Sequence, residues 1–276
     1  MKIILSKKGF DTSYGGHPSI IDGTRLISMP VPEKDGLSAY SDLYLSSDEK
    51  LSSVAEKHYK HIYVDKQRTE FSGNIKCHAD PNISNYFRLD NFRGSLGQSD
   101  NSLGQSDKAQ SHLKGQEVGK GDIFLFYGLF AEAEGGMFVG MERDVLWGYL
   151  QIDEVISVQE SLPQKQEIEN LYPWLKFQPH WRFDNTYKNN TIYIGKNYGI
   201  FNYTTELNLT KPYARFKGQW QVKALTGLGL SGTNDGVFNA DGCITMPPTF
   251  AQEYVIEEND KATQWAESII KKHIKN

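Results

Sequence analysis

An imidazole and a carboxylate stand two positions apart in the segment His78-Ala79-Asp80-Pro81. In an extended chain, residues two apart point to the same side, so His78 and Asp80 share a face. Such a pair can bind a metal ion, or it can move protons while the carboxylate tunes the imidazole. The plain structural alternative is a turn before Pro81 in which Asp80 accepts a hydrogen bond from a following amide.

A metal ion at this pair needs a third and a fourth ligand. The side chains that could supply them are those of His112, His180, Glu253 and Cys77. Their spacing along the chain selects none of them, so we predict no metal site, and the sequence identifies no cofactor. Glu253 itself stands in an extended apolar segment, where a single glutamate is more typical of a solvent-exposed residue.

A second group of chemically active residues follows the first apolar run. Lys8 and Asp11 come before Tyr14 and the pair Gly15-Gly16. A strand that runs into a glycine-containing turn can present backbone N–H groups and a charged pair at the end of a sheet. The order of residues fits neither the Walker phosphate loop nor the dinucleotide fingerprint. A turn with a purely structural role is the alternative.

Residues 180–223 are rich in aromatic and basic side chains. The segment holds ten aromatic and seven basic residues but only two acidic ones, in a chain whose net charge is −4. Bases stack on aromatic faces and phosphates attract Lys and Arg, so this composition suits a nucleotide or a nucleic acid. The alternative is a set of inward-facing strand residues with solvated charges between them.

The composition of the whole chain limits the possible classes of protein. Its 276 residues, 38% hydrophobic and 23% charged, are enough for a hydrophobic core. No apolar run reaches the ~18 residues of a transmembrane helix, and the first apolar stretch is too short for a secretory signal. The two cysteines are too few for a disulfide framework. We therefore expect a cytoplasmic protein with no membrane partner. The net charge argues against a wholly basic nucleic-acid binder but allows a local basic face.

The elements that would position these residues follow from hydrophobic periodicity. Four apolar runs predict strands, at Lys2–Ser6, Arg25–Val31, Ile123–Tyr127 and Val145–Val158. Helices are predicted over 47–62, 163–171 and 260–275, the first introduced by a capping box of Ser46 and Glu49. Because no Pro- or Ser-rich linker divides the chain, we expect one domain over 1–276. The predicted fold class is α+β, with a mixed, mostly antiparallel, partly barrel-like sheet and about three flanking helices.

The hexapeptide Ser-Leu-Gly-Gln-Ser-Asp occurs twice, at 95–100 and 102–107. One repeat with a glycine in each copy cannot form a coiled coil. We therefore interpret 95–107 as a small duplication in a surface loop.

Several of these fragments, taken in order, resemble the third type of nucleotide modification associated domain. They are Ser6-Lys7-Lys8-Gly9-Phe10-Asp11, Tyr14-Gly15-Gly16, Arg25-Leu26-Ile27-Ser28-Met29-Pro30-Val31-Pro32, His78-x-Asp80-Pro81, Leu-Gly-Gln-Ser-Asp, Ala109-Gln110-Ser111-His112-Leu113, Gly121-Asp122-Ile123-Phe124-Leu125-Phe126-Tyr127-Gly128, Trp147-Gly148-Tyr149 and Gln252-Glu253-Tyr254-Val255. The family is predicted to belong with systems that modify bases in bacterial and phage DNA. The Gly-Gln-Ser-Asp unit is normally single, and the second copy, with Gln105 rather than Gln98, has the order that the family requires. Lys7 stands where an arginine is expected.

The resemblance implies a protein that modifies a nucleotide or a DNA base, as an enzyme of unknown reaction in the conflict between bacteria and phages. The expected catalytic residues are Lys8, Asp11, His78 and Asp80. The expected substrate-binding residues are Tyr14, Gly15, Gln105, His112 and Trp147. In this scheme His78 moves a proton and is oriented by Asp80, and Lys8 binds a phosphate or a developing anion. Asp11 is a general base or accepts a hydrogen bond from a sugar hydroxyl. The expected partners are a nucleotide or DNA with a modified base and other proteins of the modification system.

The alternative function is a reader that binds a modified base without changing it. Residues 119–158 are similar to the small β-barrels of the PUA, ASCH and EVE group, through Gly121-Asp122 before one strand and Trp147-Gly148 within the next. Those barrels bind RNA or modified nucleobases. In a reader, Trp147 or a tyrosine of 193–203 would stack on the base, and binding would weaken steeply with salt.

Overall fold

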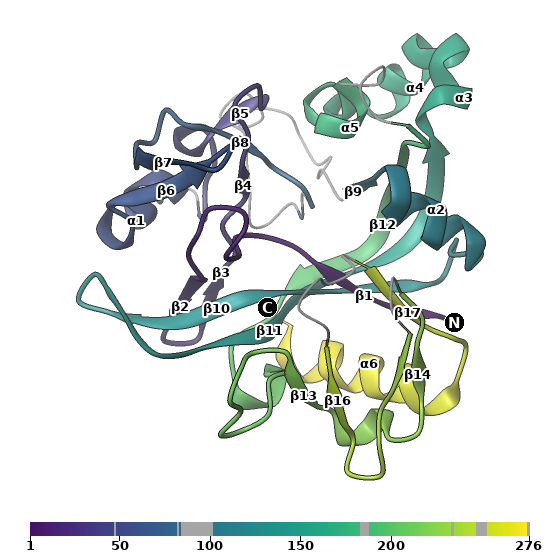
Figure 1. The fold of residues 1–276 in the computed structure, drawn as a ribbon. Helices are drawn as coiled ribbons and strands as arrows, with labels where there is room; N and C mark the ends of the chain where they lie inside the picture. Colours follow the sequence, from purple (N-terminus) through teal and green to yellow (C-terminus); the bar gives the residue numbers. More distant parts are fainter. Residues whose placement is uncertain are drawn as a thin grey trace.

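The main sheet of the protein is mixed and has eight strands in the computed structural model, which describes residues 1–46, 48–81, 83, 102–182, 188–232, 235–246 and 253–274 (Figure 1). The strands follow the spatial order β17-β1-β10-β11-β12-β9, and β2 pairs with β10 and with β3. Their bounds are β1 Ile3–Lys7, β2 Ser19–Asp22, β3 Arg25–Ile27, β9 Ser102–Gln105, β10 Ile123–Glu134, β11 Met137–Ser157, β12 Thr191–Ile200 and β17 Glu253–Ile256.

The centre of this sheet is the long hairpin of β10 and β11. Its turn is Gly135-Gly136, where both residues have positive φ, a conformation that glycine adopts without a steric cost. The first nine residues of β10 are buried, as expected of an apolar run covered on both faces. Strand β1 lies parallel to β10, so the first strand of the chain is held in the middle of the sheet.

The sheet is curled into a half-barrel, and most of its pairings are antiparallel. Only the β1–β10 and β2–β10 pairings are parallel among the described strands. The predicted fold class is therefore confirmed. The curl brings the two ends of the strand order together. Gln105 at the end of β9 therefore reaches Glu253 at the start of β17 and donates a hydrogen bond to it.

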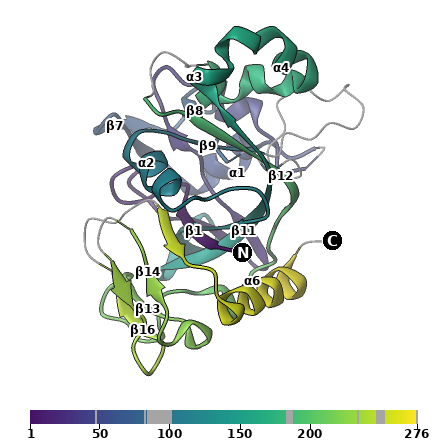
Figure 2. The same ribbon diagram turned by 90° about the vertical axis from the view of Figure 1, so that its right-hand side faces the viewer.

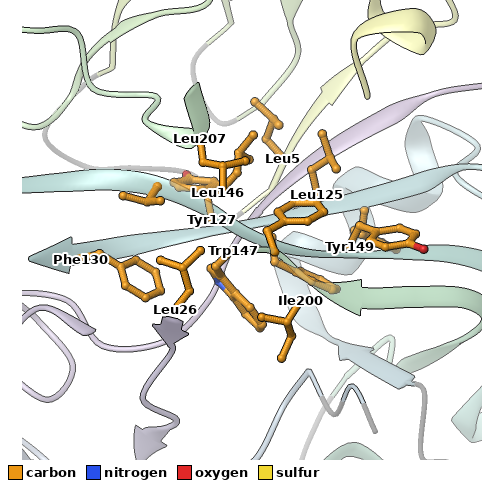
Figure 3. Packing of buried hydrophobic residues seen from close by; sticks show 14 of the residues in the cluster. Leu5, Leu26, Leu125, Tyr127, Phe130, Leu146, Trp147, Tyr149, Ile200 and Leu207 are labelled. Carbon is orange, nitrogen blue, oxygen red and sulfur yellow. The ribbon is translucent and has the colours of Figure 1, made fainter. Parts of the chain in front are cut away.

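The two faces of the sheet carry different side chains, since neighbouring residues on a strand point to opposite sides. Figure 3 shows Leu125 and Tyr127 on one side of the sheet and Trp147 and Phe130 on the other. We call the face of Ser6, Phe124 and Phe126 the concave face, because the Gln105–Glu253 contact closes over it. The face of Lys7 and Tyr127 is the outer face.

Helices and small sheets surround the main sheet. Figures 1 and 2 show α6 with the β13, β14 and β16 strands on one side of the molecule and α3 and α4 at the far end. The helices are α1 Leu51–His58, α2 Asp107–Gly115, α3 Val158–Ser161, α4 Lys165–Leu171, α5 Pro179–Arg182 and α6 Asp260–His273. The remaining strands are β4 Val31–Pro32, β5 Ser38–Ala39, β6 His61–Val64, β7 Gln67–Glu70, β8 Lys76–His78, β13 Gln219–Gln221, β14 Gly229–Leu230, β15 Gly236–Val237 and β16 Cys243–Thr245. No helix of the described residues is both long enough and apolar enough to cross a membrane.

The predicted helices agree to different degrees with the helices of the structure. The helix over 260–275 is confirmed as α6, whose first turn is capped by the side chain of Asn259. The helix over 163–171 is confirmed as α4 after a short 3-10 turn. The helix over 47–62 was predicted too long, because α1 covers only Leu51–His58 and the chain then enters β6. The capping box is wrong, since Glu49 pairs with Arg25 instead.

The repeated hexapeptide is not a surface loop in its second copy. Ser102–Gln105 form the buried strand β9, paired with β12, and the following residues begin α2. The apolar Leu103 enters the core, which anchors the strand. The first copy, with Gln98, lies outside the described residues.

Candidate functional site

A buried carboxylate lies at the centre of the candidate site. Glu253 is 2% exposed, stands opposite Ser6 across the β1–β17 ladder and lies 3.4 Å from the Nζ of Lys8. Its second named partner is the side-chain amide of Gln105. Burial raises the pKa of Glu253, while the charge of Lys8 and hydrogen bonds from Gln105 and Lys8 act in the opposite direction. The group is therefore a carboxyl held between a cation and an amide, away from water.

Three potential metal ligands gather beside it. One ligand atom each from His78, Asp80 and His180 lies within 4.8 Å of the others. The two imidazole rings meet edge to face, with their centroids 5.2 Å apart. His78 ends β8, Asp80 follows two residues later, and His180 lies in α5. The structure thus selects His180 among the four further ligands that the sequence left open.

A glycine makes the approach of His180 possible. A Cβ built on Gly104 would lie 2.1 Å from the His180 ring, so the ring packs directly on the backbone of β9. The Nδ1 of His180 lies 2.8 Å from the Oδ1 of Asn190, whose own amide donates to the His180 carbonyl. Because Asn190 is oriented by that second bond, its Oδ1 is the acceptor and the ring donates from Nδ1. The tautomer with the lone pair on Nε2 follows.

Asp80 and His78 are held by further polar partners. The Oδ1 of Asp80 accepts hydrogen bonds from the Gly104 N–H and from Gln178 Nε2, each at 2.8 Å. The Nδ1 of His78 lies 3.2 Å from Glu33 Oε2. A carboxylate can only accept a hydrogen bond, so His78 also donates from Nδ1. His78, Asp80 and His180, which we call the trio, are thus each oriented by a polar group outside the trio.

The charge of Lys8 acts on His180, one member of the trio. Burial lowers the pKa of His180 to about 4, and the charge of Asp80 opposes this, while those of His78 and Lys8 add to it. His180 is therefore a neutral imidazole near pH 7. Of the residues predicted from the sequence, the structure brings together Lys8, His78, Asp80 and Gln105.

Asp11 has a different set of partners. Its Oδ2 lies 2.6 Å from the Nζ of Lys7, and its Oδ1 accepts from the N–H groups of Ser13 and Tyr14. Burial raises the pKa of Asp11, but Lys7 and these hydrogen bonds outweigh burial and leave it lowered. Lys7 leaves β1 on the outer face, opposite to Lys8. The contacts described for Asp11 include neither Lys8 nor the trio.

The contacts described for the other predicted binding residues do not include this group. Tyr14 is exposed, and Gly15 has a φ of +79° under the ring of Phe10. His112, in α2, bonds through Nε2 to the Ser231 carbonyl at 3.0 Å. Trp147 is 1% exposed, and its ring stacks on Phe126 with centroids 5.4 Å apart. The structure therefore places Trp147 in the core.

A buried acid on the outer face was not foreseen. Asp144 is 2% exposed, accepts a hydrogen bond from the Trp220 indole at 2.8 Å, and its backbone N–H donates to Thr210. Burial raises the pKa of Asp144 to about 6, although the bond from Trp220 and the charges of Lys7 and Lys217 oppose this. The acid thus lies at the junction of β11 with the segment that carries Trp220.

The aromatic and basic segment divides into two kinds of residue. Trp181, Tyr193, Phe201 and Trp220 are buried, as in the structural alternative. The segment 211–217 is different, because it exposes two aromatic rings between basic residues. These residues are Lys211, Tyr213, Arg215, Phe216 and Lys217, with Tyr213 wholly exposed. We call residues 211–217 the basic aromatic loop.

Several residues of the site were missed or misjudged from the sequence. Glu253 was expected at the surface and is buried, because its side chain faces the concave side, where Lys8 and Gln105 cover it although β17 ends the strand order. Gln178 and Asn190 were not singled out, since an isolated amide carries no pattern. The one available signal was the concentration of Gln, His and Asn in the otherwise aromatic stretch 178–190.

Comparisons with known proteins give one match. A family model described as nucleotide modification associated domain 3 matches residues 2–234. No curated protein and no solved structure matches the chain. The similarity of residues 119–158 to PUA-like barrels therefore stays a prediction.

Proposed function

The chain belongs to the nucleotide modification associated domain 3 family, and from this premise we propose that it is an enzyme that modifies a nucleobase, in DNA or in a nucleotide. The observation that carries the proposal is the convergence of Lys8, His78, Asp80, Gln105 and Glu253. Lys8 and Gln105 contact Glu253, and Asp80, which lies beside His78, accepts a hydrogen bond from Gly104, the neighbour of Gln105 on β9. Polar groups buried at such a cost are typical of a catalytic site rather than of a scaffold.

The proposed roles follow from the chemistry of each group. Lys8 provides a positive charge for a phosphate or for an anion that develops during the reaction. The amide of Gln105 can exchange its bond to Glu253 for a bond to the edge of a base. His78 moves a proton and Asp80 helps to fix its surroundings. A base in a duplex would have to be flipped out of its stack to reach these groups.

Glu253 takes the acid–base role that the sequence assigned to Asp11. Asp11 is already neutralised by Lys7 and has a lowered pKa, which makes it a weak base. Glu253 has a raised pKa and touches Lys8, so it can hold a proton closer to neutral pH. Asp11 then has a structural role in the turn that follows β1.

The basic aromatic loop would bind the nucleic acid. Exposed Tyr213 and Phe216 offer stacking surfaces, and Lys211 and Arg215 offer charge for phosphates. We expect Tyr213→Ala to weaken binding of a single-stranded oligonucleotide by about 1–3 kcal/mol. Lys211→Ala should instead make the binding constant less dependent on salt, by the amount that corresponds to the loss of about one phosphate contact. Unchanged affinity in both variants would remove the loop from the proposal.

The proposed activity is tested by nucleoside analysis. DNA from the native host, and from phage grown on it, is digested to nucleosides and examined by mass spectrometry. The chromosomal copy is replaced by Lys8→Ala or by Asp80→Asn, and we expect a modified nucleoside to fall tenfold or more. His61→Gln, on the β6–β7 hairpin, is the matched control. Identical nucleoside profiles in the wild type and both variants would contradict the proposal.

A reader function is the second candidate, because the protein has a cavity of about 550 Å³ elsewhere. Its lining includes Tyr198, Arg25 and Asn202. Tyr198 belongs to the 193–203 stretch from which a stacking tyrosine was expected, and a cavity of this size accommodates a base. A reader should bind a modified oligonucleotide more tightly than the plain one, and Tyr198→Ala should abolish the difference. Equal binding of both oligonucleotides at every salt concentration would remove this candidate.

A further inference from the structure

We infer that His78, Asp80 and His180 form a binding site for a divalent transition-metal ion. The inference goes beyond the proposed function and changes one role within it, because a His78 whose Nε2 holds an ion cannot also move a proton at that atom. It rests on the arrangement of the three side chains and of the groups around them.

The spacing of the three ligand atoms suits a single ion. They lie within 4.8 Å of one another. A tetrahedral ion with ligand distances of ~2.1 Å separates its ligands by roughly 3.4 Å. Small rotations of side chains therefore bring the trio into coordination, with no change in the backbone of β8 or α5.

The outer partners are those that a metal site requires. In metal sites, each histidine commonly donates its other ring N–H to a carboxylate or carbonyl oxygen, which fixes the ring and its tautomer. His78 meets Glu33 in this way, and His180 meets Asn190. Both rings consequently direct their Nε2 lone pairs as ligands.

Asp80 is oriented by the same principle. Its Oδ1 accepts from the Gly104 N–H and from Gln178. We assign Oδ2 to the ion, because ligating carboxylates are in turn hydrogen-bonded by outer groups. Gln178 also bonds to Ser102 and to the backbone of His180, so one amide links two of the three ligands. Such a frame limits the rotations of the ligands before an ion arrives.

The ligand set selects the class of ion. Two imidazoles and one carboxylate favour Fe(II), Co(II), Zn(II) and related ions, while Mg(II) and Ca(II) prefer oxygen ligands. No cysteine belongs to the trio, and Cys77 directs its thiol to the Ser38 carbonyl. Three protein ligands leave further coordination positions for water or for a small ligand. A transition metal with an open position is therefore the expected occupant.

The test is metal binding by the full-length chain without a polyhistidine tag. After treatment with a chelator, the protein is titrated with Co(II), Zn(II) and Mg(II) by calorimetry, and Co(II) binding is followed by its visible absorption. We expect one Co(II) or Zn(II) per chain and much weaker Mg(II) binding. The double variant His78→Gln/Asp80→Asn should lose more than about 100-fold in affinity for Co(II). The control His61→Gln should bind as the wild type does.

A variant outside the trio separates coordination from loss of folding. Glu33 is 30% exposed, so Glu33→Ala is expected to leave the fold intact. It removes the partner of His78 Nδ1 and should weaken Co(II) binding about 10-fold. Circular dichroism and urea unfolding check that each variant is folded. Full Co(II) affinity in the folded double variant, a thiolate absorption band, or no binding by the wild type would each overturn the inference.

Discussion

Glu253 and Lys8 illustrate what a single charged pair requires at the residue scale. The carboxyl is buried, the ammonium lies 3.4 Å away and is itself mostly buried, and each compensates the desolvation of the other. Replacing one partner leaves the other charge buried and unpaired, which is more damaging than replacing both. The Lys8–Glu253 contact, which has a proposed catalytic role, therefore also stabilises the folded protein.

This relation gives a prediction for stability at pH 7. Lys8→Met should lower the free energy of unfolding by about 3 kcal/mol, because Glu253 then lacks its counter-ion. The double variant Lys8→Met/Glu253→Gln should recover part of that loss. Urea unfolding of the wild type, both single variants and the double variant measures the coupling. Additive losses would show that the two groups do not interact.

Asp144 gives a pH-dependent prediction. The folded protein has an Asp144 pKa of about 6, whereas aspartate in an unfolded chain titrates near pH ~4. The folded state therefore binds more protons between these values, and stability falls as the pH rises through them. The loss is on the order of 3 kcal/mol and is complete above about pH 6. Asp144→Asn should remove this step.

The measurement for Asp144 is urea unfolding from pH 4 to pH 7. The stability of the wild type relative to Asp144→Asn should decrease over this range, and Asp35→Asn, at an exposed position, is the control. A constant difference between the wild type and Asp144→Asn would mean that Asp144 is ionised throughout in the folded protein.

The residues of the site could be predicted from the sequence only in part. His78 and Asp80 were singled out by their two-residue spacing, although β8 ends at His78 and the Asp80 N–H bonds back to the His78 carbonyl in a turn. His180 reaches them only through the packing of α5 on β9, and no local rule contains that contact. Lys8 and Asp11 were assigned to one group, but neighbouring positions on β1 place Lys7, the partner of Asp11, on the other face.

At the scale of elements, Gly104 allows β9 and α5 to approach. A side chain there would overlap the His180 ring. We predict that Gly104→Ala displaces the ring and lowers the free energy of unfolding by about 1–3 kcal/mol, as overpacking does. Gly115→Ala is the matched control, since a Cβ at that position meets nothing within 4 Å. Urea unfolding of the two variants tests the difference, and equal stabilities would contradict the assigned role of Gly104.

Strands and helices were predicted best where the spacing of apolar residues follows a single pattern. The strands at β1, β10 and β11 and the helix α6 follow from apolar runs and a 3.6-residue period. The helix over 47–62 was extended too far because Tyr59, which caps the end of α1, and Ile62, in β6, are both buried, and their spacing matches a helix by coincidence. Positive φ values at Asp65 and Lys66 then turn this hairpin. The α2 helix, which follows the repeat, was not predicted.

At the scale of the whole molecule, the site depends on the curl of the sheet. Gln105 and Glu253 lie on strands at opposite ends of the strand order, and only the closed curl lets them bond. The family model ends at residue 234, so Glu253 lies beyond the matched segment. Polarity patterns along one strand cannot reveal which two edges meet, which is why the sequence predicted a barrel-like sheet but not this contact.

A shortened chain tests the importance of this closure. A protein that ends at residue 246 lacks β17 and α6, and it exposes the edge of β1. We predict that the amides of Ile3–Ser6 exchange faster with solvent and that the melting temperature falls. Hydrogen exchange with mass spectrometry, compared with the full-length chain, measures the first effect. Unchanged protection of these amides would show that β17 adds nothing to the stability of β1.

The Lys8–Glu253 contact can form only late in the synthesis of the chain. Roughly 245 residues separate the two, and at a synthesis rate of about 5–20 residues per second they need on the order of 10–50 s to emerge. Until then Lys8 has no charge partner, and β1 lacks β17, one of its two neighbouring strands. Every newly made copy therefore passes through an interval in which one edge of β1 is unpaired.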